Sequence, residues 1–465
     1  MNGLPESVLK LSSIFADNGY KLYLVGGYVR NMALSLSGGD LDVCSRALPE
    51  AAALFLRAEG LTVIEKAPEL GTIEVHLTQG GRKYAFEHTT FRRDFYPPGG
   101  EHRPKRVEFT GDMREDAARR DFTVNALYLD LETGETIDPT GRGLADAEQG
   151  IIRAAADPDI TISDDGLRIM RMARFAAELG FSVSADLMEA AKARAGLLAD
   201  ISAERKRDEL KKILMADVKY ETLNSEDAPE RGLQILREAG AIPYILPRLW
   251  EGDGVGQSET YHKYDVLGHG IHACACAPAA LVLRLAALLH DIGKPAALRS
   301  GGNMYRHEII GETLAAEELE RLRFENSVKS VVPPLVRNHM FDLEGRAKPK
   351  AIRRRAVKVG KGLFPLLIEL RKADFWGSGL HEGRVKSADS WQKEYERMIK
   401  TRVPWSVKEL SISGDDIMKL LNIQPSPDVG KILDMLWREC VARPEYNNPT
   451  KLKSLALSRS GDLLP

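Results

Sequence analysis

Cysteine is scarce in this chain of 465 residues, which contains only Cys44, Cys274, Cys276 and Cys440. Their spacing fits neither a zinc-binding pair nor a disulfide framework, so we expect reduced thiols in a cytoplasmic protein. Long apolar runs are missing too, since no stretch approaches the roughly 18 consecutive apolar residues of a membrane-spanning helix. The N-terminal stretch 1–20 also lacks the basic start and apolar run of a secretory signal. We therefore expect a soluble protein with no membrane partner.

Net charge is nearly absent as well, because the 65 basic residues are balanced by 67 acidic ones, which leaves a formal charge of −2. This balance excludes a uniformly cationic body, but it permits one basic surface that binds nucleic acid. The length predicts two to four domains, with enough material for packed cores that need no disulfide or structural metal. Low-complexity segments and repeats of 20 to 50 residues are not found.

The first 150 residues mix predicted strands and helices. Segment 22–25 is apolar and predicts a buried strand, which runs into Gly26-Gly27 and a helix over about 28–36. Alternation over 40–44 predicts a second strand, and 72–77 and 83–91 predict two more. The Pro-, Gly- and charge-rich stretch 92–106 is typical of a flexible loop.

From about residue 164 the apolar spacing becomes helical and continues to the end of the chain. A Gly-rich polar segment at 251–260 predicts a boundary within this region. We expect an α+β protein: a small mixed α/β head followed by an all-helical neck, body and tail. The predicted parts are 1–150, 151–250, 251–400 and 401–465.

Two carboxylates in the head, Asp40 and Asp42, are separated by one residue. On a strand such residues point to the same face, where they repel each other unless a cation lies between them. Magnesium suits this arrangement, because it prefers one or two carboxylates together with substrate phosphates. Upstream, the Gly26-Gly27 turn opens a helix whose N-terminus favours phosphate, and Arg30 would add a cation. Taken alone, the two aspartates could be an exposed acidic pair, and the two glycines could be an ordinary turn.

The run LVGGYVRNMALSLSGGDLDV, which contains all of these residues, resembles the signature of the DNA polymerase beta-like nucleotidyltransferases. More narrowly, it is similar to the bacterial tRNA nucleotidyltransferase (CCA-adding) and poly(A) polymerase family. RRDFTVNAL at 119–127, DPTGRGLADAEQGIIR at 138–153 and DDGLRIMRMARFAAELGF at 164–181 extend the likeness in the family's order. The resemblance implies a polymerase beta-like palm in the head.

The resemblance also implies roles for individual residues. Asp40 and Asp42 match the magnesium ligands, and Gly27 and Arg30 match positions that contact the incoming triphosphate. Glu87 stands where a third strand carboxylate is expected, although it could equally be an exposed strand glutamate. Asn31 departs from the family, which usually has Asp there.

Base selection without a template is expected from Asp165 and Arg168, three residues apart on a predicted helix face. Asp can accept from the exocyclic amino group of cytosine or adenine, and Arg can donate to the adjacent ring nitrogen. Uracil and guanine would leave mismatched polar groups, at about 1–3 kcal/mol each. In the family these positions read the base, and Arg171 and Arg174 match residues that contact nucleotide. Asp164 replaces the usual Glu, which leaves the choice between C and A open.

The segment RRDFTVNAL supplies Arg119, Arg120, Asp121 and Asn125, and the family uses this element at the ribose. Arg120 and Asp121 could instead form a structural ion pair, and Asn125 could be a turn residue. The loop 92–106 matches one that helps the family switch to adding A, so its presence favours an A-competent enzyme.

A second group of candidate metal ligands lies in the predicted body, 251–400. GHGIH, LLHDIGK and ELRKADFW resemble the HD superfamily and give His269, His290, Asp291 and Asp374 as metal ligands. Imidazole with carboxylate suits nickel, manganese or iron, and a metal-bound water could hydrolyse a phosphoester such as a 2′,3′-cyclic end. His307 and His339 would extend the site or be solvent-facing histidines. The module could also serve only as the body that holds tRNA.

The leading hypothesis is an enzyme that adds CCA to the 3′ end of tRNA from CTP and ATP, as a monomer or homodimer. A poly(A) polymerase, or an enzyme that adds only CC or only A, is the alternative of the same class. Other classes are an HD-type phosphohydrolase with an RNA-binding head and a non-catalytic RNA-binding protein. Backbone contacts to RNA would come from scattered cations such as Lys206, Arg207, Lys211, Lys212 and Arg353–Arg355.

Overall fold

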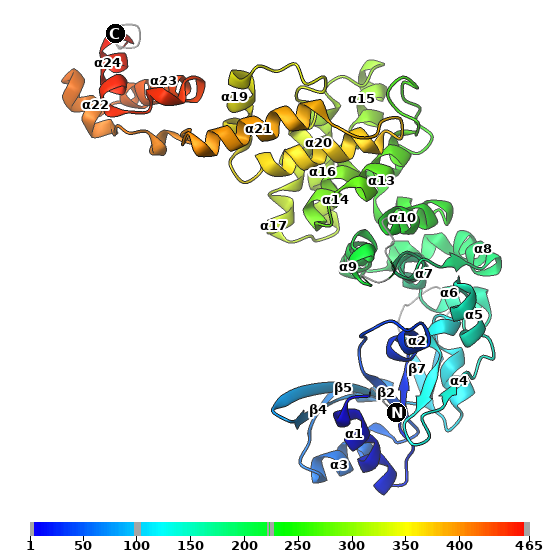
Figure 1. Ribbon diagram of the computed structural model, residues 1–465. Coiled ribbons are helices and arrows are strands. Elements are labelled where there is room, and N and C mark those ends of the chain that lie inside the picture. The colour runs from blue at the N-terminus through cyan, green and yellow to red at the C-terminus, as the bar shows by residue number, and fades with distance from the viewer. Residues whose placement is uncertain (1–3, 97–103, 221–222, 224–226, 460–465) are drawn as a thin grey trace. The chain divides into compact units, whose positions relative to one another are not determined.

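The computed structural model describes residues 4–96, 104–220, 223 and 227–459 (Figure 1). The chain forms two compact units, Met1–Pro247 and Arg248–Pro465. The first unit contains a mixed sheet followed by helices, and the second is helical. The predicted α+β class, with a mixed head followed by a helical region, is therefore confirmed.

The sheet of the first unit has seven strands in the order β3-β4-β5-β2-β1-β8-β9. These strands are β1 (Tyr23–Val25), β2 (Asp42–Ser45), β3 (Thr62–Ala67), β4 (Thr72–Gln79), β5 (Arg82–Thr90), β8 (Tyr128–Asp130) and β9 (Thr136–Ile137). The central strand β2 pairs antiparallel with β1 and parallel with β5. The parallel register sets Asp42 opposite Glu87.

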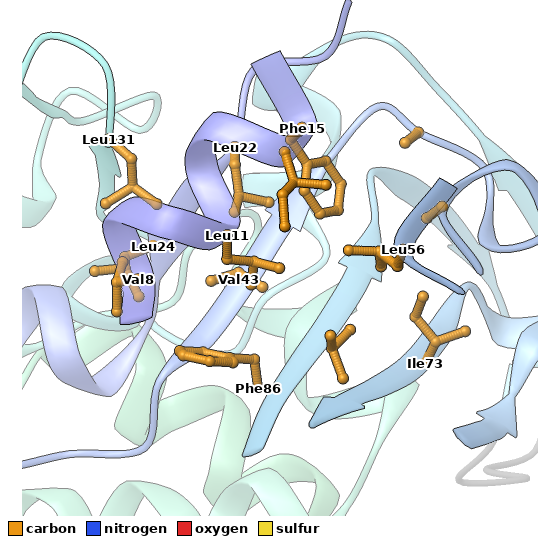
Figure 2. Packing of buried hydrophobic residues seen from close by; sticks show 14 of the residues in the cluster. Val8, Leu11, Phe15, Leu22, Leu24, Val43, Leu56, Ile73, Phe86 and Leu131 are labelled. Carbon is orange, nitrogen blue, oxygen red and sulfur yellow. The ribbon is translucent and has the colours of Figure 1, made fainter. Parts of the chain in front are cut away.

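Helices α1 (Glu6–Asp17) and α3 (Pro49–Ala58) supply the core on one face of this sheet. Figure 2 shows Phe15 of α1 and Leu56 of α3 among the strand residues Val43 and Phe86. Because successive strand residues point to opposite faces, Cys44 lies in a second cluster with Tyr128. Asp42, two residues before Cys44, is directed to that second face.

Three local predictions for the head need correction. Strand β2 begins at Asp42, so Asp40 lies in the preceding loop rather than on the strand. Helix α2 is Gly27–Ala33 and ends before the predicted residue 36. Both ends of the predicted loop 92–106 form a hairpin of β6 (Arg92–Phe95) and β7 (Arg106–Phe109), while 97–103 lie outside the described residues.

The rest of the first unit is mainly helical: α4 (Met113–Ala118), α5 (Gly143–Gln149), α6 (Pro158–Asp164), α7 (Leu167–Leu179), α8 (Ala185–Arg194), α9 (Ala203–Leu214) and α10 (Ala228–Glu238). Its short parallel pair is β10 (Ile151–Ile152) and β11 (Ser182–Val183). Helix α7 packs on α9 and α10, which leaves nearly all of its side chains buried. Helices α6 and α7 are separated by the extended residue Asp165 and by Gly166, where an added Cβ would lie 2.7 Å from Leu197 Cβ.

The second unit contains α13 (Val266–Cys276), α14 (Leu281–Leu289), α15 (Lys294–Gly301), α16 (His307–Arg321), α18 (Val332–Asn338), α19 (Pro349–Val359), α20 (Phe364–Gly377) and α21 (Lys386–Lys400). Helices α13 and α20 touch at Gly377, where an added Cβ would lie 2.6 Å from Ala273 Cα. The last helices, α22 (Gly414–Leu421), α23 (Pro427–Ala442) and α24 (Pro449–Arg459), share a small core around Leu436. None of the helices described here is long and apolar enough to cross a membrane.

Candidate nucleotide pocket and histidine–aspartate cluster

A pocket of about 510 Å³ in the first unit gathers nearly all of the residues that the sequence singled out. Glu87 is the exception, since it is exposed on β5 beside Asp42 but does not line the pocket. The predicted residues that line it are Gly26, Gly27, Arg30, Asp40, Asp42, Arg119, Arg120, Asp121, Asn125, Asp165, Arg168, Arg171 and Arg174. Segments from 26 to 174 of the chain therefore meet around one cavity.

Asp40 and Asp42 of this pocket form an acidic cluster with Glu87, which is the register partner of Asp42 in the sheet. Burial, helped by the nearby charges of Glu87 and Asp40 and opposed by Arg120, raises the pKa of Asp42 to about 6. Gathering these acids is costly for the free protein, and a divalent cation with oxygen ligands would offset that cost. The donor set therefore fits a hard ion such as magnesium.

Two glycines allow the chain to fold tightly beside these acids. Gly26 precedes α2 with φ of 78°, a left-handed conformation that favours glycine. Gly39, with φ of 138°, approaches the backbone of α2, and an added Cβ would lie 3.1 Å from Tyr28 Cα. The turn before α2 and the loop that carries Asp40 are thus brought to the same cavity.

Arg30 lines the pocket, but its guanidinium is held by protein acceptors. It donates to Asn125 Oδ1 at 2.7 Å, to Tyr220 Oη at 2.9 Å and to Asn31 Oδ1 at 2.8 Å. The side chain is 3% exposed, and burial lowers the pKa of Arg30. The geometry thus shows a clamped cation instead of one extended toward a ligand.

Asp121 bonds across the fold rather than to its neighbour in sequence. It accepts from Arg171 Nε at 2.8 Å and from Asn125 Nδ2 at 3.1 Å. Burial alone would raise the pKa of Asp121, but Arg171, Asn125 and Arg168 together lower it to about 2. Arg120 is paired with Asp116 at 3.0 Å instead, so the structural pair suggested for Arg120 and Asp121 is wrong.

The prediction that Asp165 and Arg168 share one helix face is also wrong. Asp165 stands at the break between α6 and α7 in an extended conformation. Its Oδ2 accepts from Arg205 Nη2 at 2.7 Å. Arg168 donates to the carbonyls of Thr161 at 2.9 Å and Arg119 at 2.8 Å, and Asp164 lies 3.8 Å away. Both side chains line the pocket, each fixed by other partners.

The spacing of the α7 arginines suggested a stripe of positive charge, but acidic partners neutralise much of it. Arg171 pairs with Asp121 at 2.5 Å, and Arg174 pairs with Glu209 at 2.8 Å. The guanidinium carbons of Arg171 and Arg174 also lie 5.3 and 4.1 Å from the ring centroid of Phe175. The stripe is therefore ordered and largely charge-balanced.

Several residues of the pocket escaped the sequence reasoning: Arg92, Asp94, Tyr96, Phe175, Glu178, Lys219 and Tyr220. Lys212, which was expected to contact the RNA backbone, also lines the pocket. Phe175 lies at helical spacing among the apolar residues of α7, a pattern that is typical of core packing. Tyr220 is 190 residues from Arg30, and no local pattern links such distant positions. Lys206 and Arg353 were expected to contact the RNA backbone. Both are instead buried and donate to backbone carbonyls of the protein.

The second unit brings the predicted histidines and aspartates together in two triads. His269 Nε2, His290 Nε2 and Asp374 Oδ1 are 3.0, 3.2 and 3.4 Å apart. Ligand atoms about 2.1 Å from one ion, at angles of 90° to 109°, are separated by roughly 3.0 to 3.4 Å. This triad therefore has the spacing of a transition-metal site.

The second triad consists of Asp291, His307 and His339. His307 Nε2 lies 3.1 Å from Asp291 Oδ1 and 3.2 Å from His339 Nε2. Both histidines are buried, so the solvent-facing alternative is wrong.

The first triad has a perturbed histidine. Burial alone would lower the pKa of His290, but Asp291 and Asp374 raise it, so metal binding there would displace a proton.

A pocket of about 510 Å³ opens onto this cluster, which we call the HD pocket. Lys294 Nζ contacts Asp291 Oδ2 at 2.5 Å and Arg371 Nη1 contacts Asp374 Oδ2 at 2.7 Å. The apolar side of the pocket includes Phe375, whose ring stacks on His381 with centroids 4.8 Å apart.

Comparison with protein families gives three matches in chain order. The poly A polymerase head domain matches residues 22–153, and the probable RNA- and SrmB-binding site of polymerase A matches 180–252. The HD domain matches 267–374.

Curated relatives match about half of the chain. A CCA-adding enzyme of Geobacillus thermodenitrificans is 36% identical over 248 residues, which are 52% of this chain and 55% of the relative. A CCA-adding enzyme of Streptococcus pyogenes is 40% identical over 213 residues, 45% of this chain and 50% of the relative. The matches thus span about half the length of these relatives.

Solved structures resemble the whole chain. A crystal structure of the Bacillus stearothermophilus CCA-adding enzyme in complex with CTP has a TM-score of 0.68 at 25% identity and covers 99% of both chains. A Thermotoga maritima CCA-adding enzyme complexed with tRNA has a TM-score of 0.57 at 16% identity and covers 98% of this chain and 96% of its own, a likeness of fold.

Proposed function

Because the chain belongs to the tRNA nucleotidyltransferase and poly(A) polymerase family and carries an HD domain, we propose that it adds CCA to the 3′ end of tRNA from CTP and ATP. The observation that carries the proposal is the acidic cluster of Asp40, Asp42 and Glu87 beside the glycine turn. The CCA-adding relatives at 36 and 40% identity match about half of the chain, and they make CTP and ATP the favoured substrates.

In the proposed reaction the RNA 3′-hydroxyl attacks the α-phosphorus of the nucleotide, and pyrophosphate leaves. Asp40 and Asp42, with Glu87 alongside, would hold the magnesium ions. When bound, these ions lower the pKa of the attacking hydroxyl and neutralise the triphosphate. Arg30, clamped by Asn125 and Tyr220, would add a fixed positive charge at the phosphates, which costs no reordering on binding. Gly26 and Gly27 would let the phosphates approach the backbone.

The base would be read from the break between α6 and α7. Arg205 fixes the Asp165 carboxylate, and two carbonyls fix the Arg168 guanidinium, so both present rigid edges to the pocket. These edges complement the amino group and ring nitrogen of cytosine and adenine, and they mismatch uracil and guanine at about 1–3 kcal/mol for each unpaired group. Arg119, Arg120, Asp121 and Asn125 would contact the ribose side, and Arg171 and Arg174 the nucleotide.

The test uses tRNA that lacks its last three nucleotides, with magnesium and each nucleotide triphosphate singly and then in pairs. We expect growth by three nucleotides with CTP plus ATP, followed by arrest. Asp40→Ala/Asp42→Ala should abolish incorporation, whereas Asp17→Ala/Glu59→Ala, two exposed acids of the same unit, should retain it. Full incorporation by the first double variant would refute the proposal. Long A tails would identify a poly(A) polymerase, and arrest after CC or after A a partial enzyme.

A second candidate function is phosphoester hydrolysis at the HD pocket, and the spacing of the two metal-ligand triads favours it. The ions would be nickel, manganese or iron, held by His269, His290, Asp291 and Asp374, with His307 and His339 in the second triad. Hydrolysis of a 2′,3′-cyclic nucleotide with nickel, lost in Asp374→Ala, would support this function. Absence of hydrolysis with nickel, manganese and iron, in protein shown to bind each metal, would refute it.

The division into a head (1–150), neck (151–250), HD-type body (251–400) and tail (401–465), with tRNA held by the tail, is part of the proposal. Cytoplasmic localisation follows from the same function.

A further inference from the structure

Helix α19 carries positive charge that has no acidic counterpart in its own segment. Residues 346–361 contain eight Lys and Arg and no Asp or Glu. Arg353 is the internal member, because it is 7% exposed and its Nη1 contacts Glu394 Oε1 at 2.5 Å. Lys350, Arg354 and Lys358 are exposed at intervals of four residues, which sets them along one side of the helix.

The exposed cations of this helix are not neutralised locally. In the portions of the chain that the structure describes, Lys348, Lys350, Arg354 and Lys358 make no ion pair. Burial lowers the pKa of the half-buried Arg355, and the nearby charge of Arg337 lowers it further. This surface is therefore unsatisfied electrostatically and favours an anion.

These cations line a groove rather than a flat surface. Two hollows of about 340 and 440 Å³ adjoin each other and share Phe341, Arg355 and Lys358. The Arg355 guanidinium lies 4.7 Å from the Phe341 ring centroid and donates to Asn338 Oδ1 at 2.9 Å. The cations of what we call the α19 groove are Arg337, Lys348, Lys350, Arg354, Arg355 and Lys358. Glu308 is the one carboxylate among the described lining residues, and it lies 3.9 Å from Arg337.

We propose that the α19 groove binds the sugar–phosphate backbone of an RNA strand. This inference rests on the proposed function in that it takes RNA as the substrate, and it assigns a surface to that substrate outside the nucleotide pocket. The stripe from Lys350 to Lys358 is about 12 Å long at 1.5 Å per residue. A strand of a nucleic-acid duplex carries a phosphate about every 3 Å of axis, so that length meets roughly four phosphates.

The concave shape decides between RNA and a membrane. An anionic bilayer would reach exposed lysines, but it would not enter hollows whose walls include the half-buried Arg337 and Arg355. A strand of separated phosphates can do so, and planar guanidinium groups match phosphate geometry.

The α19 groove also meets the HD pocket. Met340 lines both cavities, and the consecutive residues Asn338 and His339 face the groove and the metal-ligand cluster respectively. A strand held in the groove would therefore pass beside the HD cluster.

The test measures RNA binding by the full chain, without relying on catalysis. Fluorescence anisotropy would follow a labelled tRNA lacking its last three nucleotides, in EDTA, over a series of salt concentrations. The variant Lys348→Gln/Lys350→Gln/Arg354→Gln/Lys358→Gln removes exposed charges only. The matched control, Lys386→Gln/Lys393→Gln/Arg397→Gln/Lys400→Gln, removes four exposed charges from α21. Unchanged melting temperatures would show that both variants fold.

We expect the α19 variant to raise Kd at least about tenfold at 0.1 M salt and to reduce the slope of log K against log salt by about 3, because each lost phosphate contact removes roughly 0.7 to 0.9. The α21 variant should behave as the wild type. Equal affinity and slope for the α19 variant and the wild type would overturn the proposal. So would unchanged RNA binding with lost binding to phosphatidylserine vesicles, which would assign the groove to a membrane.

Incorporation assays separate this inference from the proposed function. If both hold, the α19 variant will show a raised KM for tRNA and an unchanged kcat at saturating tRNA. If the wild type binds tRNA through the groove but adds no nucleotide, the proposed function fails and the groove assignment stands. Normal CCA addition with an unchanged KM for tRNA would refute the groove alone.

Discussion

Tyr220 Oη accepts a hydrogen bond from Arg30 Nη2 at 2.9 Å and donates one to Asn31 Oδ1 at 3.2 Å, although Tyr220 follows α9 and Arg30 belongs to α2. The same guanidinium donates to Asn125, which in turn donates to Asp121, the carboxylate that holds Arg171 of α7. The glycine turn and helix α7 are thus joined by one buried hydrogen-bond chain. Such a chain keeps the two sides of the pocket in a fixed geometry before a ligand arrives.

Tyr220→Phe should raise KM for the nucleotide more than it lowers kcat. The change removes both hydrogen bonds of the hydroxyl and loosens the Arg30 clamp, at about 1–2 kcal/mol, or roughly 5- to 30-fold. Steady-state kinetics on tRNA would measure the split between KM and kcat. Tyr244→Phe, outside the pocket, is the control. An unchanged KM in Tyr220→Phe would show that the clamp does not position the nucleotide.

Asp116→Asn should destabilise the first unit strongly at pH 7. Asp116 is fully buried and accepts from Arg119, Arg120 and Tyr128. Breaking such a network at one partner costs roughly 3–5 kcal/mol. A fall in melting temperature at pH 7 would be read by calorimetry, and a loss comparable with that of an exposed Asp17→Asn would contradict the prediction.

The loss of stability caused by Asp116→Asn should also depend on pH. Burial alone would raise the pKa of Asp116, but Arg120 and Arg119 lower it to about 2 from 3.8. Because the folded pKa is depressed, the ionised form contributes its full stability above about pH 4 and loses it as pH falls toward 2. The difference in melting temperature between wild type and Asp116→Asn should therefore be constant from pH 7 to 5 and shrink below pH 4. A difference that grows on acidification would reverse the assigned sign.

Metal content should distinguish the two triads of the HD pocket. Asp374 belongs to the triad with His269 and His290, whereas His307 belongs to the triad with Asp291 and His339. His307→Ala should lower the metal bound per chain without removing it, and His307→Ala/Asp374→Ala should remove nearly all of it. Elemental analysis after dialysis against nickel or manganese would measure this. Tight metal binding by the double variant would refute both triads.

Gly377→Ala should destabilise the second unit by about 1–3 kcal/mol, the range for overpacking a core. The new Cβ would lie 2.6 Å from Ala273 Cα, and backbone cannot yield as a side chain can. Gly430→Ala is the matched control, since no atom lies within 4 Å of its added Cβ in α23, and it should stabilise by about 0.5–1 kcal/mol. Chemical denaturation would measure both, and equal stability of the two variants would contradict the close contact.

The sequence by itself determined the elements whose signals are local. The strands around Val25, Val75 and Phe86 were predicted within about two residues, because short apolar runs and alternating residues are local signals of a strand. Motifs such as GGDLD and LLHDIGK likewise identified both sites, since each needs a few residue types at fixed spacing.

Only the tertiary structure decided how these residues are paired. Asp165 and Arg168 looked like one helix face, but Asp165 is extended between α6 and α7, and each side chain takes another partner. Asp121 bonds to Arg171 rather than Arg120, and Tyr220 reaches Arg30 across 190 residues. A buried charge is satisfied by whichever donor the packing brings near, and spacing along the chain carries no record of that distance.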